Sequence, residues 1–104
     1  MNKIQENFKY FTKEHKEIYD AYANYGKLIH EQGGPLDEKT RALIKVVVSS
    51  VNCRNYALET HINKAIKASC THEEIEHAIL LTGPSVGFPN MMESIMVLRA
   101  VLNK

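Results

Sequence analysis

Residues 40–61, TRALIKVVVSSVNCRNYALETH, decide the fold that we predict for this chain. In the first half of the stretch, apolar residues recur at steps of three and four, which is the period of a helix with a wide buried face. The three valines at residues 46–48 have strand propensity, but the flanking helical period and the lack of a partner strand favour a helix. The dipeptide Asn52-Cys53 predicts a short break, after which a second helix leads to His61. We therefore expect two helices that meet, with His61 at the inner end.

Upstream of this stretch, residues 4–31 are predicted to form one long amphipathic helix. Its apolar side carries Phe8, Phe11, His15, Ile18, Tyr22, Tyr25 and Ile29, at three- and four-residue steps. We interpret this stripe as core or subunit interface. The two glycines at residues 33 and 34 predict a left-handed helix end, and Pro35 cannot continue the helix. Asp37 is then expected to cap the next helix.

Downstream, residues 51–69 predict a third helix, and Thr71 with Glu74 fits a capping box that opens a fourth. The Gly-Pro pair at residues 83–84 is expected to end that helix. Pro89 occupies the tolerated first turn of a last helix, which is apolar on much of its circumference. Such a wide apolar face exceeds what one small domain covers, so we expect burial in an oligomer. The pattern predicts an all-α fold of about five helices.

Composition limits the classes of function. With 104 residues, the chain is expected to be a single domain over residues 1–104. The net charge is +1, from 13 Lys and Arg against 12 Asp and Glu, and no basic block is present. We therefore expect no nucleic-acid partner and no membrane partner. No apolar run approaches the ~20 residues that span a bilayer.

The cysteines and the start of the chain bear on location. Cys53 and Cys70 have no recognisable metal or redox spacing, so we expect free thiols and no metal site. The first residues lack the continuous apolar segment of a signal peptide. Both features favour a reducing, cytoplasmic location.

The order of several short motifs resembles a known family. The matching pieces are Leu36-Asp37-Glu38-Lys39-Thr40-Arg41, then Asn52, Tyr56 and Glu59-Thr60-His61, then Lys64-Ala65-Ile66-Lys67-Ala68, Thr71-His72-Glu73-Glu74-Ile75 and Val86-Gly87-Phe88-Pro89. Together, residues 36–89 resemble the carboxymuconolactone decarboxylase and alkylhydroperoxidase-D-like family. The resemblance implies an alkylhydroperoxidase-D-like helical bundle that forms homotrimers or homohexamers, with its site near subunit contacts.

The chain departs from the family's redox motif. Redox members carry Cys-x-x-Cys-x-x-x-His and a glutamate on the preceding helix. With His61 as the anchor, Arg54 and Ala57 stand at the cysteine positions and Ala42 at the glutamate position. A recycling disulfide needs two sulfurs, so the peroxidase mechanism is not carried over. Cys53 is adjacent to the first position; we expect a small buried hydrophobe there, with a lone redox thiol as the alternative.

The remaining residues predict a different site. Arg54, Ala57, Leu58 and His61 are expected to share one helical face. Arg54 would anchor a small carboxylate through two hydrogen bonds, and His61 would exchange a proton near neutral pH. An arginine near the first cysteine position also suits the family's decarboxylase branch. Two structural alternatives stay open: Arg54 pairs with an acid across an interface, or His61 satisfies a backbone carbonyl.

These features predict a lyase- or isomerase-type enzyme that acts on a small carboxylated molecule without a cofactor. His61 is the predicted catalytic residue, and Arg54 and Phe88 are the predicted substrate-binding residues. One alternative is an oligomeric binding or structural protein that keeps the fold and lacks the chemistry. Another is a residual peroxidase-type, antioxidant role through Cys53.

Overall fold

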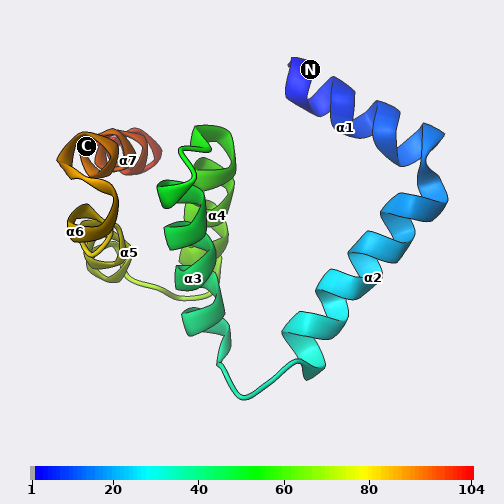
Figure 1. Cartoon of the computed structure of the whole chain (residues 1–104), viewed down its shortest axis with the longest axis horizontal. Helices are drawn as coiled ribbons and strands as arrows, with labels where there is room; N and C mark the ends of the chain where they lie inside the picture. The colour runs from blue at the N-terminus through cyan, green and yellow to red at the C-terminus, as the bar shows by residue number, and fades with distance from the viewer. Residues whose placement is uncertain (1) are drawn as a thin grey trace. The chain divides into compact units, whose positions relative to one another are not determined.

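The computed structural model describes residues 2–104, and these residues form helices with no strand among them (Figure 1). Six helices have nine residues or more, and one has four. In chain order they are α1 (Lys3–Glu14), α2 (Lys16–Gln32), α3 (Glu38–Val51), α4 (Asn55–Lys67), α5 (His72–Leu80), α6 (Gly83–Val86) and α7 (Phe88–Leu102). The predicted all-α class is confirmed for the described residues, whereas the predicted number of helices is too low. The chain divides into two compact units, Met1–Pro35 and Leu36–Lys104.

The N-terminal unit contains two helices where the sequence predicts one. The helix is interrupted at His15, whose backbone leaves the helical region (φ −124°, ψ 47°). Aromatic rings pack across the interruption: Phe8 meets Tyr19 edge to face at 5.5 Å between ring centroids, and His15 lies 5.2 Å from Phe11. Because neither proline nor glycine stands at this point, the residue pattern gives no signal for the break.

The end of α2 also differs from the expectation. Gly33 follows the last helical residue but keeps a right-handed conformation (φ −75°, ψ −19°), so the predicted left-handed cap is wrong. Its amide donates to the Ile29 carbonyl at 3.1 Å. Glycine is needed for another reason, since a Cβ at residue 33 would clash with that same carbonyl oxygen.

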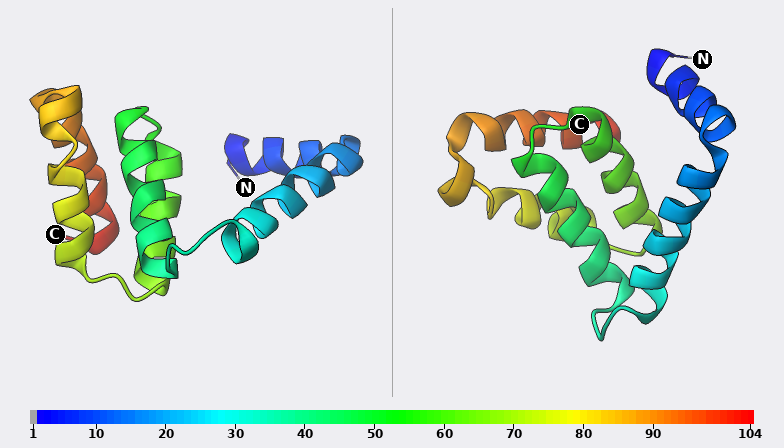
Figure 2. Two further views of the ribbon diagram at one scale, coloured as in Figure 1. Left: turned by 60° about the horizontal axis from the view of Figure 1, so that its bottom comes forward. Right: turned by 45° about the vertical axis from the view of Figure 1, so that its right-hand side comes forward.

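Leu36–Lys104 form a four-helix core. Here α3 and α4 lie side by side, and α5 and α7 pack against them (Figure 2). The buried cluster consists of Val46, Leu58, Ile62, Ala65, Cys70, Ile75, Ile79 and Leu98. Residues 46–48 lie within α3, so their predicted helical state is confirmed. Val46 faces the buried cluster from this helix.

Two helix starts are capped as predicted. The Asp37 carboxylate accepts the Thr40 amide at 2.8 Å and starts α3. The capping box of α5 is complete: the Thr71 hydroxyl accepts the Glu74 amide at 3.0 Å, and the Glu74 carboxylate accepts the Thr71 amide at 2.7 Å. Lys39 pairs with Glu74 at 3.2 Å, so the first turns of α3 and α5 are tied together.

The Gly-Pro pair at residues 83–84 does not stop a helix directly. Instead α5 ends at Leu80, and the pair forms the first turn of the short helix α6. Proline fits there because a first-turn residue has no intrahelical partner for its amide. Gly87, with φ 95°, then reverses the chain, and Pro89 lies in the first turn of α7 as predicted.

A buried polar contact joins α3 to α7. The hydroxyls of Ser50 and Ser94 lie 2.7 Å apart, and the two residues are 1% and 2% exposed. Each hydroxyl is the other's partner, so the contact satisfies both polar groups away from water. Within residues 2–104, no helix combines the length and the apolar character that crossing a membrane requires.

The serine pair gives a stability prediction. Ser94→Ala leaves the Ser50 hydroxyl buried without its partner, so the free energy of unfolding should fall by about 1–3 kcal/mol. The double variant Ser50→Ala/Ser94→Ala removes both polar groups and should cost less than the two single changes added together. Urea unfolding of the four proteins measures this coupling, and strictly additive losses would contradict it.

The capping box gives a pH prediction. The hydrogen bond from the Thr71 amide, and then the one from Lys39, hold the pKa of Glu74 below its ordinary value of 4.5. A lowered folded-state pKa stabilises the fold above pH 4.5, and that contribution disappears as the pH falls through the folded value. Glu74→Gln should therefore melt below wild type at neutral pH, with the difference closing in acid. Thermal melting against pH tests this, with Glu76→Gln on the same helix as the control that should show no such closing.

Candidate functional site

The turn between α3 and α4 places Cys53 and Arg54 at the surface. Cys53 has a left-handed backbone (φ 55°), which is uncommon for a residue other than glycine. Its amide donates to the Ser50 carbonyl and that of Arg54 to the Ser49 carbonyl, both at 3.1 Å. The predicted break near Asn52-Cys53 is confirmed. The prediction of a buried Cys53 is wrong, because the residue is exposed at this turn.

Polar side chains connect this turn to the start of α7. The Cys53 thiol donates to the Asn90 side-chain oxygen at 2.8 Å, and the Asn90 amide donates to the Ser50 carbonyl at 3.0 Å. Asn55 donates to Glu93 at 2.9 Å. The partners lie 37 to 40 positions apart in the chain. The sequence analysis did not identify Asn90 and Glu93, because no local pattern indicates a hydrogen bond between residues so far apart in the chain.

His61 lies on α4 beside the buried row Leu58, Ile62 and Ala65. It is half-buried, whereas the other four histidines of the chain are exposed. The imidazole of His61 is thus partly shielded from water.

The predicted shared face of α4 is only partly observed. Arg54 precedes the helix as its N-cap residue (φ −99°, ψ 80°), so it does not follow the helical register. Leu58 is fully buried and faces the core, while Arg54 is exposed. Ala57 and His61 are both half-buried and remain neighbours one turn apart on α4.

Phe88 is the first residue of α7 and is 66% exposed. It stands two residues before Asn90, the partner of Cys53, so the element that carries Phe88 meets the α3–α4 turn. The structure thus joins the elements of Cys53, Arg54 and Phe88 at one end of α4. His61 lies about 10 Å farther along that helix, at 1.5 Å per residue.

Cys70 has a different environment. It lies in the core at 5% exposure, and burial raises the pKa of its thiol. The thiol donates to the Lys39 carbonyl at 3.7 Å. Both cysteines are free, as predicted.

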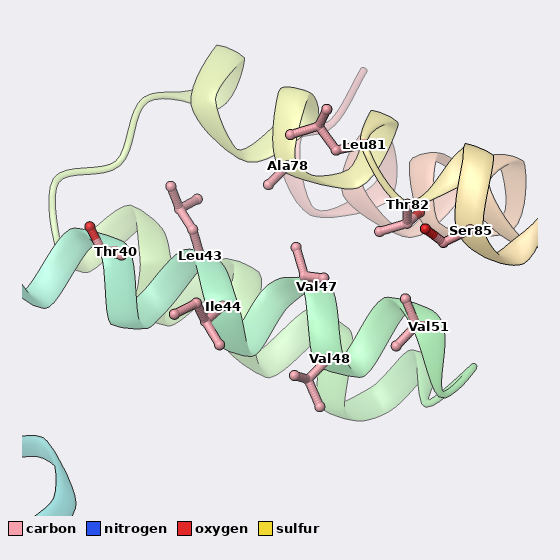
Figure 3. A pocket seen from close by; sticks show the side chains of 10 residues that line it. All are labelled: Thr40, Leu43, Ile44, Val47, Val48, Val51, Ala78, Leu81, Thr82 and Ser85. Carbon is pink, nitrogen blue, oxygen red and sulfur yellow. The ribbon is translucent and has the colours of Figure 1, made fainter. Parts of the chain in front are cut away.

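Several hollows mark the described part of the C-terminal unit. One of them, of about 490 Å³, is an apolar groove between α3 and α5 (Figure 3). A hollow of about 340 Å³ lies between α4 and α7, lined by residues that include Tyr56, Glu59 and Val101. The third, about 310 Å³, follows α4. None of these three is lined by His61, Arg54 or Phe88, whose roles remain predictions.

Comparison with known proteins gives one match. The model of the carboxymuconolactone decarboxylase family matches residues 16–100, which include α2 to α6 and most of α7. Neither the curated proteins nor the solved structures compared with the chain contain a match. The family match extends the resemblance seen in residues 36–89 toward both ends of the chain. The chain belongs to the carboxymuconolactone decarboxylase family.

Proposed function

We propose that the protein is a lyase- or isomerase-type enzyme that acts on a small carboxylated molecule by acid–base chemistry. His61 transfers the proton, and no cofactor takes part. The observation that carries the proposal is the position of His61, the one half-buried histidine, within the segment that matches the family. An imidazole titrates near neutral pH, so it can both accept and donate a proton under ordinary conditions.

The start of α4 supplies features that favour a carboxylate. Arg54 carries a permanent cation at the surface, and its planar guanidinium matches the two oxygens of a carboxylate. It also stands at the positive end of the helix dipole, where its side chain does not cap the helix. Phe88, exposed at the start of α7, offers a ring for the apolar part of the same molecule.

Assembly into a homotrimer or homohexamer is a second part of the proposal. No residue of α1 or α2 is buried, although both helices carry large apolar side chains. Among them, Phe8 is 56% exposed, Tyr22 73% and Tyr25 62%. Apolar area of this extent is stabilised when other subunits cover it.

The loss of the cysteine pair supports a rival function, that of an oligomeric binding or structural protein. Substitution at His61 separates the two. If the proposal is right, His61→Gln keeps the melting temperature and abolishes binding or turnover, measured by ligand-observed NMR and product analysis over a panel of small carboxylates and lactones. His77→Gln, at an exposed histidine of α5, is the matched control and should change neither property. A loss of about 1–3 kcal/mol in unfolding free energy, with no carboxylate bound by wild type, would instead identify a structural His61.

Arg54 gives a test of the carboxylate anchor. Arg54→Lys keeps the charge but loses the two-pronged contact, so affinity for a bound carboxylate should fall about tenfold or more. Arg99→Lys, at an exposed arginine of α7, should leave affinity unchanged. Equal affinities for wild type and Arg54→Lys would remove Arg54 from the site.

The structure supports a redox role through Cys53 less well than the acid–base role of His61 that we propose. It is exposed and donates to Asn90, but residues 54 and 57 carry no sulfur, and Cys70 is buried. A disulfide cycle needs a second accessible thiol. We therefore expect no dithiol-dependent peroxide reduction, followed as loss of peroxide. Turnover that disappears in Cys53→Ser would show that the thiol is the reacting group.

A further inference from the structure

The apolar stripe of α1 and α2 continues through the break between the two helices. Its members recur at alternating steps of four and three residues: Ile4, Phe8, Phe11, His15, Ile18, Tyr22, Tyr25 and Ile29. This alternation places all members on one side of a single helix. The period keeps its phase at residue 15, and no proline stands between residues 3 and 32. The sequence pattern is therefore that of one uninterrupted helix.

The backbone departs from such a helix at one residue. Glu14 ends α1 and Lys16 begins α2, while His15 between them has φ −124° and ψ 47°. An α-helix needs a φ of about −63° and a ψ of about −42°. The His15 amide still donates to the Phe11 carbonyl at 2.8 Å, and the His15 carbonyl accepts the Tyr19 amide at 2.9 Å. A change in the dihedral angles of His15 therefore separates the bent segment from a straight helix.

A second set of aromatic rings belongs to the bent form. Tyr10 and Tyr19 lie outside the stripe, and each contacts a member of it. Phe8 meets Tyr19 edge to face at 5.5 Å between ring centroids, and Tyr10 meets His15 at 6.4 Å. In a straight helix, Phe8 and Tyr19 would lie about 16 Å apart along the axis, so their rings could not meet. The contact between these two rings therefore requires the bend.

We propose that residues 3–32 form a hinged helix with two forms, the bent form described above and a straight form, and that His15 is the hinge. The sequence supplies residues for each form: the stripe suits the straight helix, and Tyr10 and Tyr19 suit the bend. In the straight form the stripe is one surface about 38 Å long, whereas the bend divides it into two segments. The hinge thus controls how much continuous apolar surface the N-terminal unit presents.

No packed core fixes the hinge in the bent form, because no residue of α1 or α2 is buried. The bent form is stabilised by ring contacts at the surface, and the straight form by the helical hydrogen bonds that the break removes. Both contributions are small in contact with water. Hinges in proteins are commonly a few residues at the ends of helices or strands that take up a change in dihedral angles, and His15 has this position.

The experiment measures a distance across the hinge by double electron–electron resonance on the full chain. Spin labels are attached at Glu6→Cys and Lys27→Cys in a Cys53→Ser background, while Cys70 is buried. Both labelled positions are exposed and lie on the side of the helix opposite to the stripe. In a straight helix they are about 32 Å apart along the axis, and in the bent form they are closer. An excess of unlabelled chain keeps pairs of labels on different chains rare.

The first variant removes the contact that only the bent form makes. Tyr19→Ala should raise the fraction of long distances at least twofold relative to wild type. Tyr22→Ala is the matched control, since it makes the same change on the same helix at a tyrosine that is 73% exposed, and it should leave the distances unchanged. A long fraction that Tyr19→Ala leaves at the wild-type value, or that Tyr22→Ala raises equally, would overturn the hinge.

The second variant acts at the hinge itself and leaves Tyr19 in place. His15→Leu continues the stripe with a strong helix former and removes the ring that Tyr10 contacts, so it should also raise the long fraction. Asn24→Leu introduces the same residue at an exposed position within α2 and should have no such effect. Equal distance distributions for His15→Leu and Asn24→Leu would show that His15 is not the hinge.

Discussion

The hydrogen bond between the buried hydroxyls of Ser50 and Ser94 holds together the part of the molecule on which the candidate site depends. It fixes the last turn of α3 against α7 inside the core, where two unpaired hydroxyls would be costly. With this contact made, Asn90 on α7 reaches both the Ser50 carbonyl and the Cys53 thiol. The left-handed turn at Cys53 and the start of α4 are thereby held from two sides. Arg54, the next residue after Cys53, lies exposed at this turn.

Much of the fold was predictable because the signals are local. Asp37 and Thr71 cap helices through atoms three residues away, and the core row of α4 follows the helical period. The break at His15 has no such local signal, because neither glycine nor proline stands there. Aromatic contacts of Phe8 with Tyr19 and of Phe11 with His15 accompany the break. The prediction that Gly83 and Pro84 end a helix is wrong for a different reason. A Gly-Pro pair is compatible with the end of one helix and with the first turn of the next, and here it forms the first turn of α6.

The candidate site was less predictable than the fold. The half-buried position of His61 follows from helical periodicity, because three buried residues of α4 lie beside it. The predicted face shared with Arg54 is only partly observed, since Arg54 is the N-cap residue and α4 starts one residue after it. Asn90, Glu93 and Ser94 could not be found from the sequence at all. Their partners lie about 40 positions away, and polar residues on an apolar helix give no indication of what they will meet.

Helix α3 connects the buried core and the α3–α5 groove with the turn that carries Arg54. One side carries Val46, Ser49 and Ser50 into the core, and the other lines the groove between α3 and α5. Val48 lies on the outer side, and its carbonyl accepts the amide of Asn52, the residue that opens the turn to Cys53 and Arg54. The last turn of α3 thus borders both the groove and the turn that presents Arg54. Because the hydrogen bond between Ser50 and Ser94 anchors this turn of the helix in the core, it restrains the backbone from which Arg54, the proposed carboxylate anchor, projects. Pre-organised side chains bind with less loss of conformational entropy. On this reasoning, the buried contact between α3 and α7 contributes to the affinity of the carboxylate site that we propose.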